Sequence, residues 1–267
     1  MSHLKVSPQY DAETGQLIKI TPQSAGWKYV GFEVVQLRQG QSTVQETLDN
    51  EVAVVVLSGI VTLKTKAATW NNIGQRMSVF EKIAPYTVYV PAQDRIEIAA
   101  ETEAELAFCK APGGGGLPAR LIAPTDVGVE VRGKGNMERL IHNILPESQP
   151  ADSLLVVEVF TPQGHWSSYP PHKHDQLNLP EESLLEETYY HKISPDKGFA
   201  IQRVYTDDRS LDETIVVGHN DVVLVPKGYH PVGAPPGYEV YYLNVMAGPV
   251  RSWKFKNDKD HAWLFGR

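Results

Sequence analysis

Two histidines that stand two residues apart, His172 and His174, are the residues of this chain whose type and spacing best suit a metal ion. Side chains of a β-strand alternate between its faces, so both imidazoles would point to one side and reach the same ion. Downstream, Glu187 supplies a carboxylate and His230 a third imidazole. Such a mixed nitrogen and oxygen set suits zinc or manganese, with iron(II) as a further option. We therefore predict one divalent metal site at these four residues.

Each of the two histidine motifs is weak evidence for a metal site when it is taken alone. A His-x-His pair is common on protein surfaces, and the Pro-Lys-Gly-Tyr sequence that precedes His230 also marks an ordinary turn. The metal is favoured because both motifs occur in order, joined by strand-rich sequence with a glutamate between them. The sequence leaves the choice of glutamate open, with three alternatives to Glu187: Glu181, Glu182 and Glu186.

Composition narrows the class of protein. Hydrophobic residues make up 42% of the 267 residues, which is normal for a globular protein with a packed core. The net charge of −7 argues against a general nucleic-acid surface. The single cysteine, Cys109, cannot form an internal disulfide, and we expect it to be a small buried thiol. The N-terminal residues form no apolar run typical of a signal peptide, and no stretch is apolar enough to span a membrane, so the cytoplasm is the expected location.

The elements that must position these residues are predicted to be short β-strands. Runs rich in β-branched and aromatic residues recur at intervals typical of an all-β sandwich or barrel. The segment 60–65 is expected to form a hairpin with the strand before it. In order, the predicted strands are 27–37, 52–59, 60–65, 87–91, 96–99, 105–109, 139–145, 154–160, 187–193, 199–205, 214–217, 221–226 and 238–246.

A composition break divides the chain. Residues 111–118 place four glycines between two prolines, and no helix start follows that would make them a phosphate-binding loop, so we interpret them as a connector. The predicted domains are residues 1–118 and 119–267. Faint self-similarity between the halves suggests a duplicated β-domain, and the first copy, which has no His-x-His, is expected to hold no metal. His142, among apolar neighbours, is expected to be structural.

The metal motifs resemble the pattern of the cupin family. Cupins carry His-x-His followed by a glutamate, and then a strand that ends in Pro-x-Gly and a third histidine. In this chain Glu187 lies 13 residues after His174, farther than is usual in cupins, which an inserted loop over residues 176–185 would explain. Longer stretches, including 166–175, 185–190, 202–208 and 226–231, resemble the bicupin isomerases of bacterial myo-inositol catabolism, which are related to the hexuronate ketol-isomerases. This resemblance covers essentially the whole chain.

The resemblance implies a bicupin with two barrel-like domains and a metal-dependent aldose–ketose isomerisation of 5-deoxy-glucuronate to 2-deoxy-5-keto-gluconate. Tyr189 lies two residues after Glu187, on the same strand face, and is the candidate catalytic residue, although the base itself stays unassigned. Gln202 and Arg203 point to opposite faces of one strand, and the sequence does not say which faces the site. The candidate substrate-binding residues are Tyr169, Gln202, Arg203 and Tyr229.

Two other functions remain compatible with the sequence. A cupin dioxygenase would use the same ligands with iron(II), because metal identity depends on geometry and supply as well as on ligand type. A non-catalytic sugar-binding bicupin needs no intact ligand set, and this chain carries one. The expected partner is a small sugar acid, with neither nucleic acid nor membrane. A homo-oligomer is also compatible with the sequence.

Overall fold

The computed structural model describes residues 2–266 and consists almost entirely of short strands in antiparallel pairs. The predicted all-β class is therefore confirmed. Contacts divide the chain into two compact units. The N-terminal unit comprises Pro8–Gly128 and Asn143–Val156, and the C-terminal unit comprises Met1–Ser7, Val129–His142 and Val157–Arg267. We keep the boundary between residues 118 and 119 as a proposal for where the two sequence halves join.

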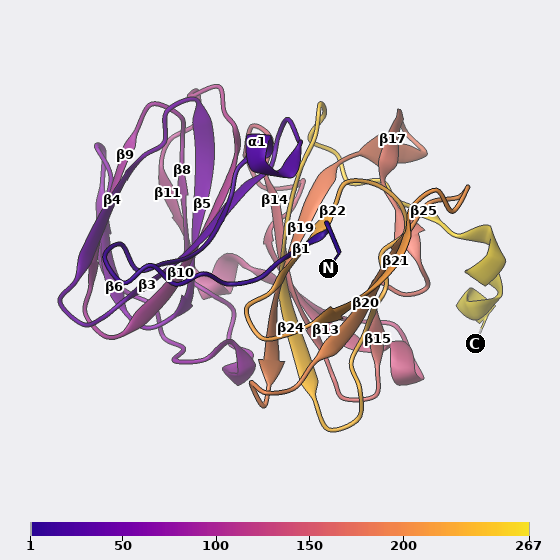
Figure 1. The fold of residues 1–267 in the computed structure, drawn as a ribbon. Helices are drawn as coiled ribbons and strands as arrows, with labels where there is room; N and C mark the ends of the chain where they lie inside the picture. Colours follow the sequence, from indigo (N-terminus) through magenta and orange to yellow (C-terminus); the bar gives the residue numbers. More distant parts are fainter. Residues whose placement is uncertain (1, 267) are drawn as a thin grey trace. The chain divides into compact units, whose positions relative to one another are not determined.

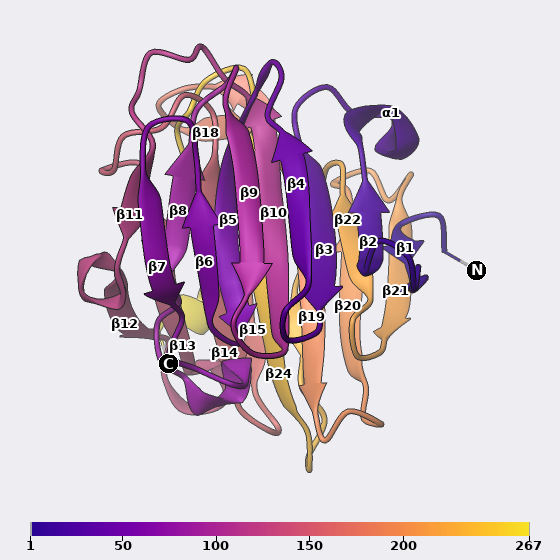
Figure 2. The same ribbon diagram turned by 90° about the vertical axis from the view of Figure 1, so that its left-hand side faces the viewer.

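The N-terminal unit is a sandwich of two sheets, with the four-stranded sheet lying over the larger one in Figure 2. In spatial order, the six-stranded sheet contains β11 (Arg120–Ile122), β8 (Thr87–Val90), β5 (Asn50–Ser58), β10 (Ala104–Pro112), β3 (Gly31–Leu37) and β2 (Gln16–Ile20). The four-stranded sheet contains β4 (Ser42–Glu46), β9 (Arg95–Ala100), β6 (Val61–Lys64) and β7 (Thr69–Ile73). This unit also holds α1 (Pro22–Ala25), η1 (Val79–Glu81) and η2 (Pro124–Asp126).

Apolar side chains fill the space between these two sheets. Val54 and Phe108 come from the larger sheet, Leu63 and Ile98 come from the smaller one, and all four are at most 1% exposed. Such a core follows from the alternation of side chains in strands that cover each other on one face. Cys109 is also fully buried, as predicted.

The predicted hairpin between residues 52–59 and 60–65 is wrong. The strand β5 pairs with β8 and β10, whereas β6 pairs with β7 and β9 in the other sheet. Gly59 lies between β5 and β6 with a φ of +89°, and a Cβ there would lie 2.2 Å from the carbonyl oxygen of Glu103. Glycine alone fits this conformation comfortably, and the chain uses it to pass from one sheet to the other.

The C-terminal unit is also built from facing sheets, and Figure 1 shows β19, β22 and β24 in one layer and β20 and β21 in the other. The seven-stranded sheet contains β1 (Lys5–Val6), β22 (Val222–Val225), β19 (Glu186–Ser194), β24 (Glu239–Ala247), β14 (Leu155–Thr161), β13 (Arg139–Leu145) and β12 (Gly128–Arg132). Its strands β12, β13 and β14 cross the division between the units. The facing sheet contains β15 (Trp166–Ser167), β23 (Val232–Gly233), β20 (Ala200–Tyr205) and β21 (Asp212–Val217).

Two small ribbons and two 3-10 helices complete this unit. The ribbons pair β16 (His172–Lys173) with β25 (Lys256–Asn257), and β17 (Asp175–Asn178) with β18 (Glu182–Leu184). The helices are η3 (Gly135–Met137) and η4 (Lys259–Gly266). Through β25 the C-terminal tail is paired to the His-x-His strand. Among residues 2–266, no helix is both long and apolar enough to cross a membrane.

Candidate metal centre

Three of the four predicted ligands converge in the interior of the C-terminal unit. The side chains of His174, Glu187 and His230 are at most 3% exposed, and one potential ligand atom from each lies within 4.8 Å of the others. The Nε2 atoms of His174 and His230 lie 3.0 and 3.3 Å from the same oxygen of Glu187, Oε2. The carboxylate therefore sits between two imidazoles, as in a metal-binding cluster.

Strand alternation brings His174 to this cluster. Lys173, on the opposite face, is 1% exposed and forms ion pairs with Asp175 at 2.6 Å and Asp207 at 3.1 Å. It also lies 3.4 Å from Glu182, one of the alternative carboxylates. Glu182 is therefore engaged by a lysine on the far side of the strand, and Glu187, at the start of β19, is the carboxylate that the fold brings to the histidines.

A tight turn after β22 directs His230 inward. Gly228 has a φ of +89°, and a Cβ there would lie 2.4 Å from the carbonyl oxygen of Tyr205. Tyr205 and Tyr229 form an isolated β-bridge, and their backbone groups exchange hydrogen bonds of 2.7 and 2.9 Å. The glycine thus allows a close approach that fixes Tyr229 on one side and leaves His230 facing the opposite side.

His172 lies beside the three converging residues. Its ring centroid is 5.1 Å from that of His230 and 4.7 Å from that of Phe255 in the C-terminal tail. It also lines a cavity of about 310 Å³ that opens from this position. The structure thus places His172 at the border between the cluster and the cavity, with its ring packed on Phe255.

The hydrogen bonds of the histidines suit a cation. Nδ1 of His174 lies 3.2 Å from the carbonyl oxygen of Leu185, and Nδ1 of His230 lies 2.8 Å from that of Gly228. A carbonyl oxygen only accepts, so each Nδ1 carries a hydrogen, and Nε2 is the nitrogen of each ring that faces Glu187. Nε2 of His230 is buried without a hydrogen-bond partner among the described residues. Two imidazole nitrogens beside one buried carboxylate, one of them without a hydrogen-bond partner, fit a divalent ion.

Burial controls the protonation of the histidines. It lowers the pKa of His172 and of His230 to about 3, assisted by the other histidines of the group. Both rings are therefore neutral near pH 7, the form that binds metals. Burial also lowers the pKa of His174, but the hydrogen bond and charge of Glu187 outweigh it and leave that pKa raised.

Tyr189 lies next to the cluster on the inner face of β19. Its ring centroid is 5.6 Å from that of His230, and its hydroxyl lies 2.9 Å from Ser168 Oγ. Burial, together with the negative charge of Glu187, raises its pKa well above the usual value for tyrosine. The phenol is therefore protonated at neutral pH and can donate a hydrogen bond or a proton.

Of the two candidate residues on β20, Gln202 faces the interior and Arg203 faces outward. Gln202 is fully buried, with its Oε1 at 2.9 Å from His191 Nε2 and its Nε2 donating to the carbonyl oxygen of His230. Arg203 is on the outer face, where its guanidinium donates two hydrogen bonds of 2.7 Å to Asp212. Gln202 thus supports the backbone that carries a candidate ligand, whereas Arg203 is not brought to the site.

The two remaining tyrosine candidates differ in position. Tyr169 lines the same cavity as His172, with its ring centroid 5.6 Å from that of Trp166. Tyr229 is buried, and its hydroxyl donates to Asp207 at 2.9 Å, on the side occupied by Lys173. Tyr169 is therefore placed to contact a ligand, and Tyr229 is turned away from the cluster. His142, expected to be structural, lies outside it, with Nδ1 at 2.7 Å from Glu158 Oε1.

Sequence reasoning missed Arg139, which lines the cavity together with His172 and Tyr169. No motif includes it. A usable signal was the alternation in β13, because Ile141 belongs to the core of the C-terminal unit and Arg139, two residues earlier, shares its face. The tail residues that wall the cavity were also missed: Phe255, Asn257, Leu264 and Phe265.

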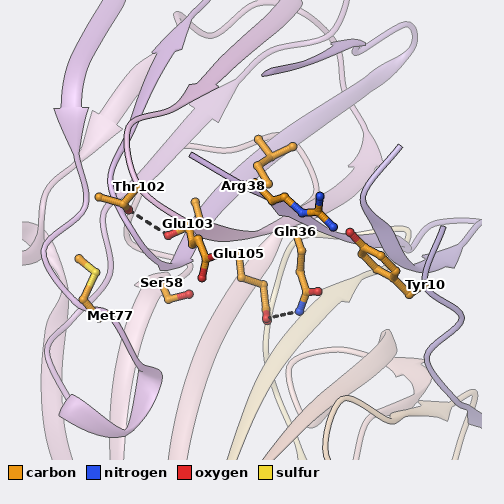
Figure 3. A pocket seen from close by; sticks show the side chains of 10 residues that line it. Tyr10, Gln36, Arg38, Ser58, Met77, Thr102, Glu103 and Glu105 are labelled. Carbon is orange, nitrogen blue, oxygen red and sulfur yellow. Dashed lines mark hydrogen bonds between the residues drawn. The ribbon is translucent and has the colours of Figure 1, made fainter. Parts of the chain in front are cut away.

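A second cavity, of about 500 Å³, lies in the N-terminal unit and is drawn in Figure 3. Its lining contains no histidine. Gln36 donates a 3.0 Å hydrogen bond to Glu105 on the neighbouring strand, and Arg38 and Tyr10 lie near one end. It offers no cluster of nitrogen and oxygen donors comparable to that around Glu187.

Comparison with curated proteins finds close relatives over the full length. The 5-deoxy-glucuronate isomerase of Geobacillus thermodenitrificans is 66% identical over 264 residues, which cover 99% of this chain and 96% of the relative. A solved IolB-like protein from Salmonella typhimurium LT2 superposes with a TM-score of 0.97 at 52% identity, covering 99% of this chain and 100% of that one.

More distant structures share the fold alone. The oxalate decarboxylase of Lactobacillus farciminis superposes with a TM-score of 0.69 at 13% identity, covering 100% of this chain and 91% of that one. The model of the KduI/IolB family matches residues 4–264. With a family match over nearly the whole chain and full-length relatives at high identity, the chain belongs to the KduI/IolB family.

Proposed function

We propose that this chain is a metal-dependent aldose–ketose isomerase that converts 5-deoxy-glucuronate to 2-deoxy-5-keto-gluconate in myo-inositol catabolism. The observation that carries the proposal is the 66% identity over 99% of the chain to a protein named for that activity. The convergence of His174, Glu187 and His230 supports it, because a cation held beside a carbonyl group would promote this chemistry.

The proposed ligands are His172, His174, Glu187 and His230, and the proposed ion is zinc or manganese, with iron(II) as the alternative. When bound, such an ion supplies Lewis acidity that polarises the carbonyl group of the substrate. The neutral states of His172 and His230 at pH 7 leave their nitrogens free to coordinate.

The isomerisation moves hydrogen between two adjacent carbons and moves a proton between their oxygens, with no net oxidation. Tyr189 is proposed as the residue that donates to the substrate oxygen gaining a proton, since its raised pKa keeps the phenol protonated. Its hydroxyl is oriented by Ser168, and Gln202 holds the backbone of His230 in place. Tyr169 is proposed to contact the sugar from the cavity wall.

The test is an assay of ketose formation from 5-deoxy-glucuronate, followed by NMR, with purified protein of measured metal content. Chelation should abolish turnover, and adding back manganese or zinc should restore it. His172→Ala should lose activity. A matched control is His165→Ala, because His165 contacts the carbonyl oxygen of Glu138 and lies outside the cluster.

Absence of turnover by protein that contains its metal would refute the isomerase. Dioxygen uptake in an electrode would then indicate a dioxygenase, and sugar-acid binding without turnover would indicate a binding protein. Light scattering in the same preparation would test whether the chain forms a homo-oligomer.

A further inference from the structure

Arg139 is a buried cation without an acidic partner. The residue is 8% exposed, and its Nη1 donates to two backbone carbonyl oxygens, those of Met137 at 3.0 Å and Tyr169 at 3.2 Å. Within residues 2–266, no carboxylate lies at ion-pair distance from it. Burying a charge is costly unless the charge is paired, so this guanidinium is matched to an anion that the chain itself does not supply.

Another buried base of the same unit shows the contrast. Lys173 is 1% exposed and lies within 3.4 Å of carboxylate oxygens of Asp175, Asp207 and Glu182. The fold thus places three carboxylates against Lys173, whereas the hydrogen bonds of Arg139 go to neutral carbonyl groups. The difference sets Arg139 apart as a ligand-binding group rather than a structural one.

The cavity beside Arg139 is suited to a small anion. Arg139, Arg132 and Lys134 all line it, and no aspartate or glutamate does, although the chain carries a net charge of −7. Gly133 keeps space for the guanidinium, because a Cβ there would lie 2.9 Å from Arg139 Nη1. A largely apolar part of the lining comes from the C-terminal tail, through Phe255 and three residues that follow it: Asn257, Leu264 and Phe265.

The same cavity reaches the metal centre through His172, whose ring lies 5.1 Å from that of His230 between centroids. The cavity is thus lined both by a proposed metal ligand and by a buried guanidinium. A sugar acid has a matching polarity, with a carbonyl group at one end and a carboxylate at the other.

We propose that Arg139 binds the carboxylate of the sugar acid in a forked pair of hydrogen bonds, holding the far end of the substrate while its carbonyl end faces the metal centre. This assignment rests on the proposed function. Guanidinium geometry matches a carboxylate through two parallel N–H donors, which an ammonium group cannot reproduce. Arg139 is thus the residue that selects acids over neutral sugars and sets the register of the reacting carbons.

The experiment compares 5-deoxy-glucuronate with its methyl ester, which is similar in size but uncharged. Hydrogen bonds to charged groups predict that the wild-type protein prefers the acid by about 10- to 100-fold in kcat/KM. Arg139→Gln should remove most of this preference by weakening turnover of the acid while leaving the ester within a few-fold. Arg139→Lys, which keeps the charge but not the fork, should retain part of it.

Arg209→Gln is the matched control, because Arg209 packs over the ring of Tyr205 away from the cavity. Metal content and melting temperature are measured for every variant. Calorimetric titration of the metal-loaded proteins with D-glucuronate and its methyl ester gives a second readout, in which only the Arg139 variants should lose discrimination.

The outcomes separate the two proposals. An unchanged preference for the acid in folded, metal-loaded Arg139→Gln would overturn the role of Arg139 and leave the isomerase standing. If the wild-type protein turns over neither compound, the proposed isomerase activity is refuted. The role of Arg139 is then tested by the calorimetric titrations alone. Discrimination of glucuronate from its ester that depends on Arg139 would then support the carboxylate site, and its absence would overturn it.

Discussion

The buried His191 should make the stability of this protein depend on pH. The residue is fully buried in the C-terminal unit, where its ring lies beside those of Tyr189 and Tyr242, at centroid distances of 6.0 and 5.7 Å. Its Nε2 is bonded to Gln202, and its Nδ1 has no partner among the described residues. Burial lowers its pKa from 6.5 to about 4. Between these two pH values, His191 is therefore neutral in the folded protein and protonated in the unfolded chain.

The sign and size of the effect follow from linkage. Between pH 6.5 and about 4 the unfolded state binds more protons than the folded state, so stability falls as the pH falls through this window. A difference of about 2.5 pH units, at about 1.36 kcal/mol for each, amounts to about 3.4 kcal/mol in total. Between pH 7 and pH 5, the contribution of His191 is about 2 kcal/mol.

Urea unfolding of chelated protein at pH 7 and pH 5 measures this contribution, because chelation removes the separate effect of protons on metal binding. Other buried histidines also lower stability in acid, so the informative quantity is the difference between wild type and His191→Gln. Glutamine can still donate to Gln202 but does not titrate. The variant should lose about 2 kcal/mol less than wild type between the two pH values.

His165→Gln serves as the control, because it makes the same substitution at a more exposed histidine outside the metal cluster. Equal losses of stability in wild type and His191→Gln would refute the reasoning. Such a result would mean that the folded protein admits a proton at this position as readily as the unfolded chain does.

Three further predictions concern the site. Glu187→Gln should lower metal affinity by at least about 100-fold, while Glu182→Gln should leave it within a few-fold; calorimetric metal titration would contradict this if both variants behaved alike. Tyr189→Phe should reduce kcat by about 100-fold or more with metal content unchanged, and near-normal kcat would exclude Tyr189 as a proton donor. Gly228→Ala should destabilise the protein by about 1–3 kcal/mol in urea unfolding, because the Cβ of alanine would meet the carbonyl oxygen of Tyr205. Unchanged stability would show that the turn tolerates a side chain at this position.

Much of the fold was predictable because it depends on local patterns. Runs of β-branched residues marked most of the long strands, and the alternation of side chains correctly separated His174 from Lys173. The partner of β6 was not predictable in the same way. A segment directly after a strand and a turn usually forms a hairpin with it, but Gly59 allows the chain to cross to the other sheet.

Spacing along the chain limited the candidate carboxylates of the cluster to a few glutamates but could not show which one binds. Residues 175–184 contain the β17–β18 ribbon, which absorbs the extra length between the second histidine and the glutamate. The ribbon directs Glu182 toward Lys173 and leaves Glu187 at the start of β19. Spacing counts residues along the chain, whereas a metal site depends on distances across a fold.

What the sequence determined by itself was the type of chemistry: three histidines and a glutamate in strand-rich sequence, with a period of two that sets which side chains share a face. Only the tertiary structure decided that Gln202 faces inward and Arg203 outward, because the facing sheet covers one side of β20 and leaves the other to solvent. It alone brought Arg139 to the cavity of His172, 33 residues along the chain, together with the C-terminal tail. A pocket is assembled from segments that pack together in space, and neither spacing nor periodicity records which distant segments will meet.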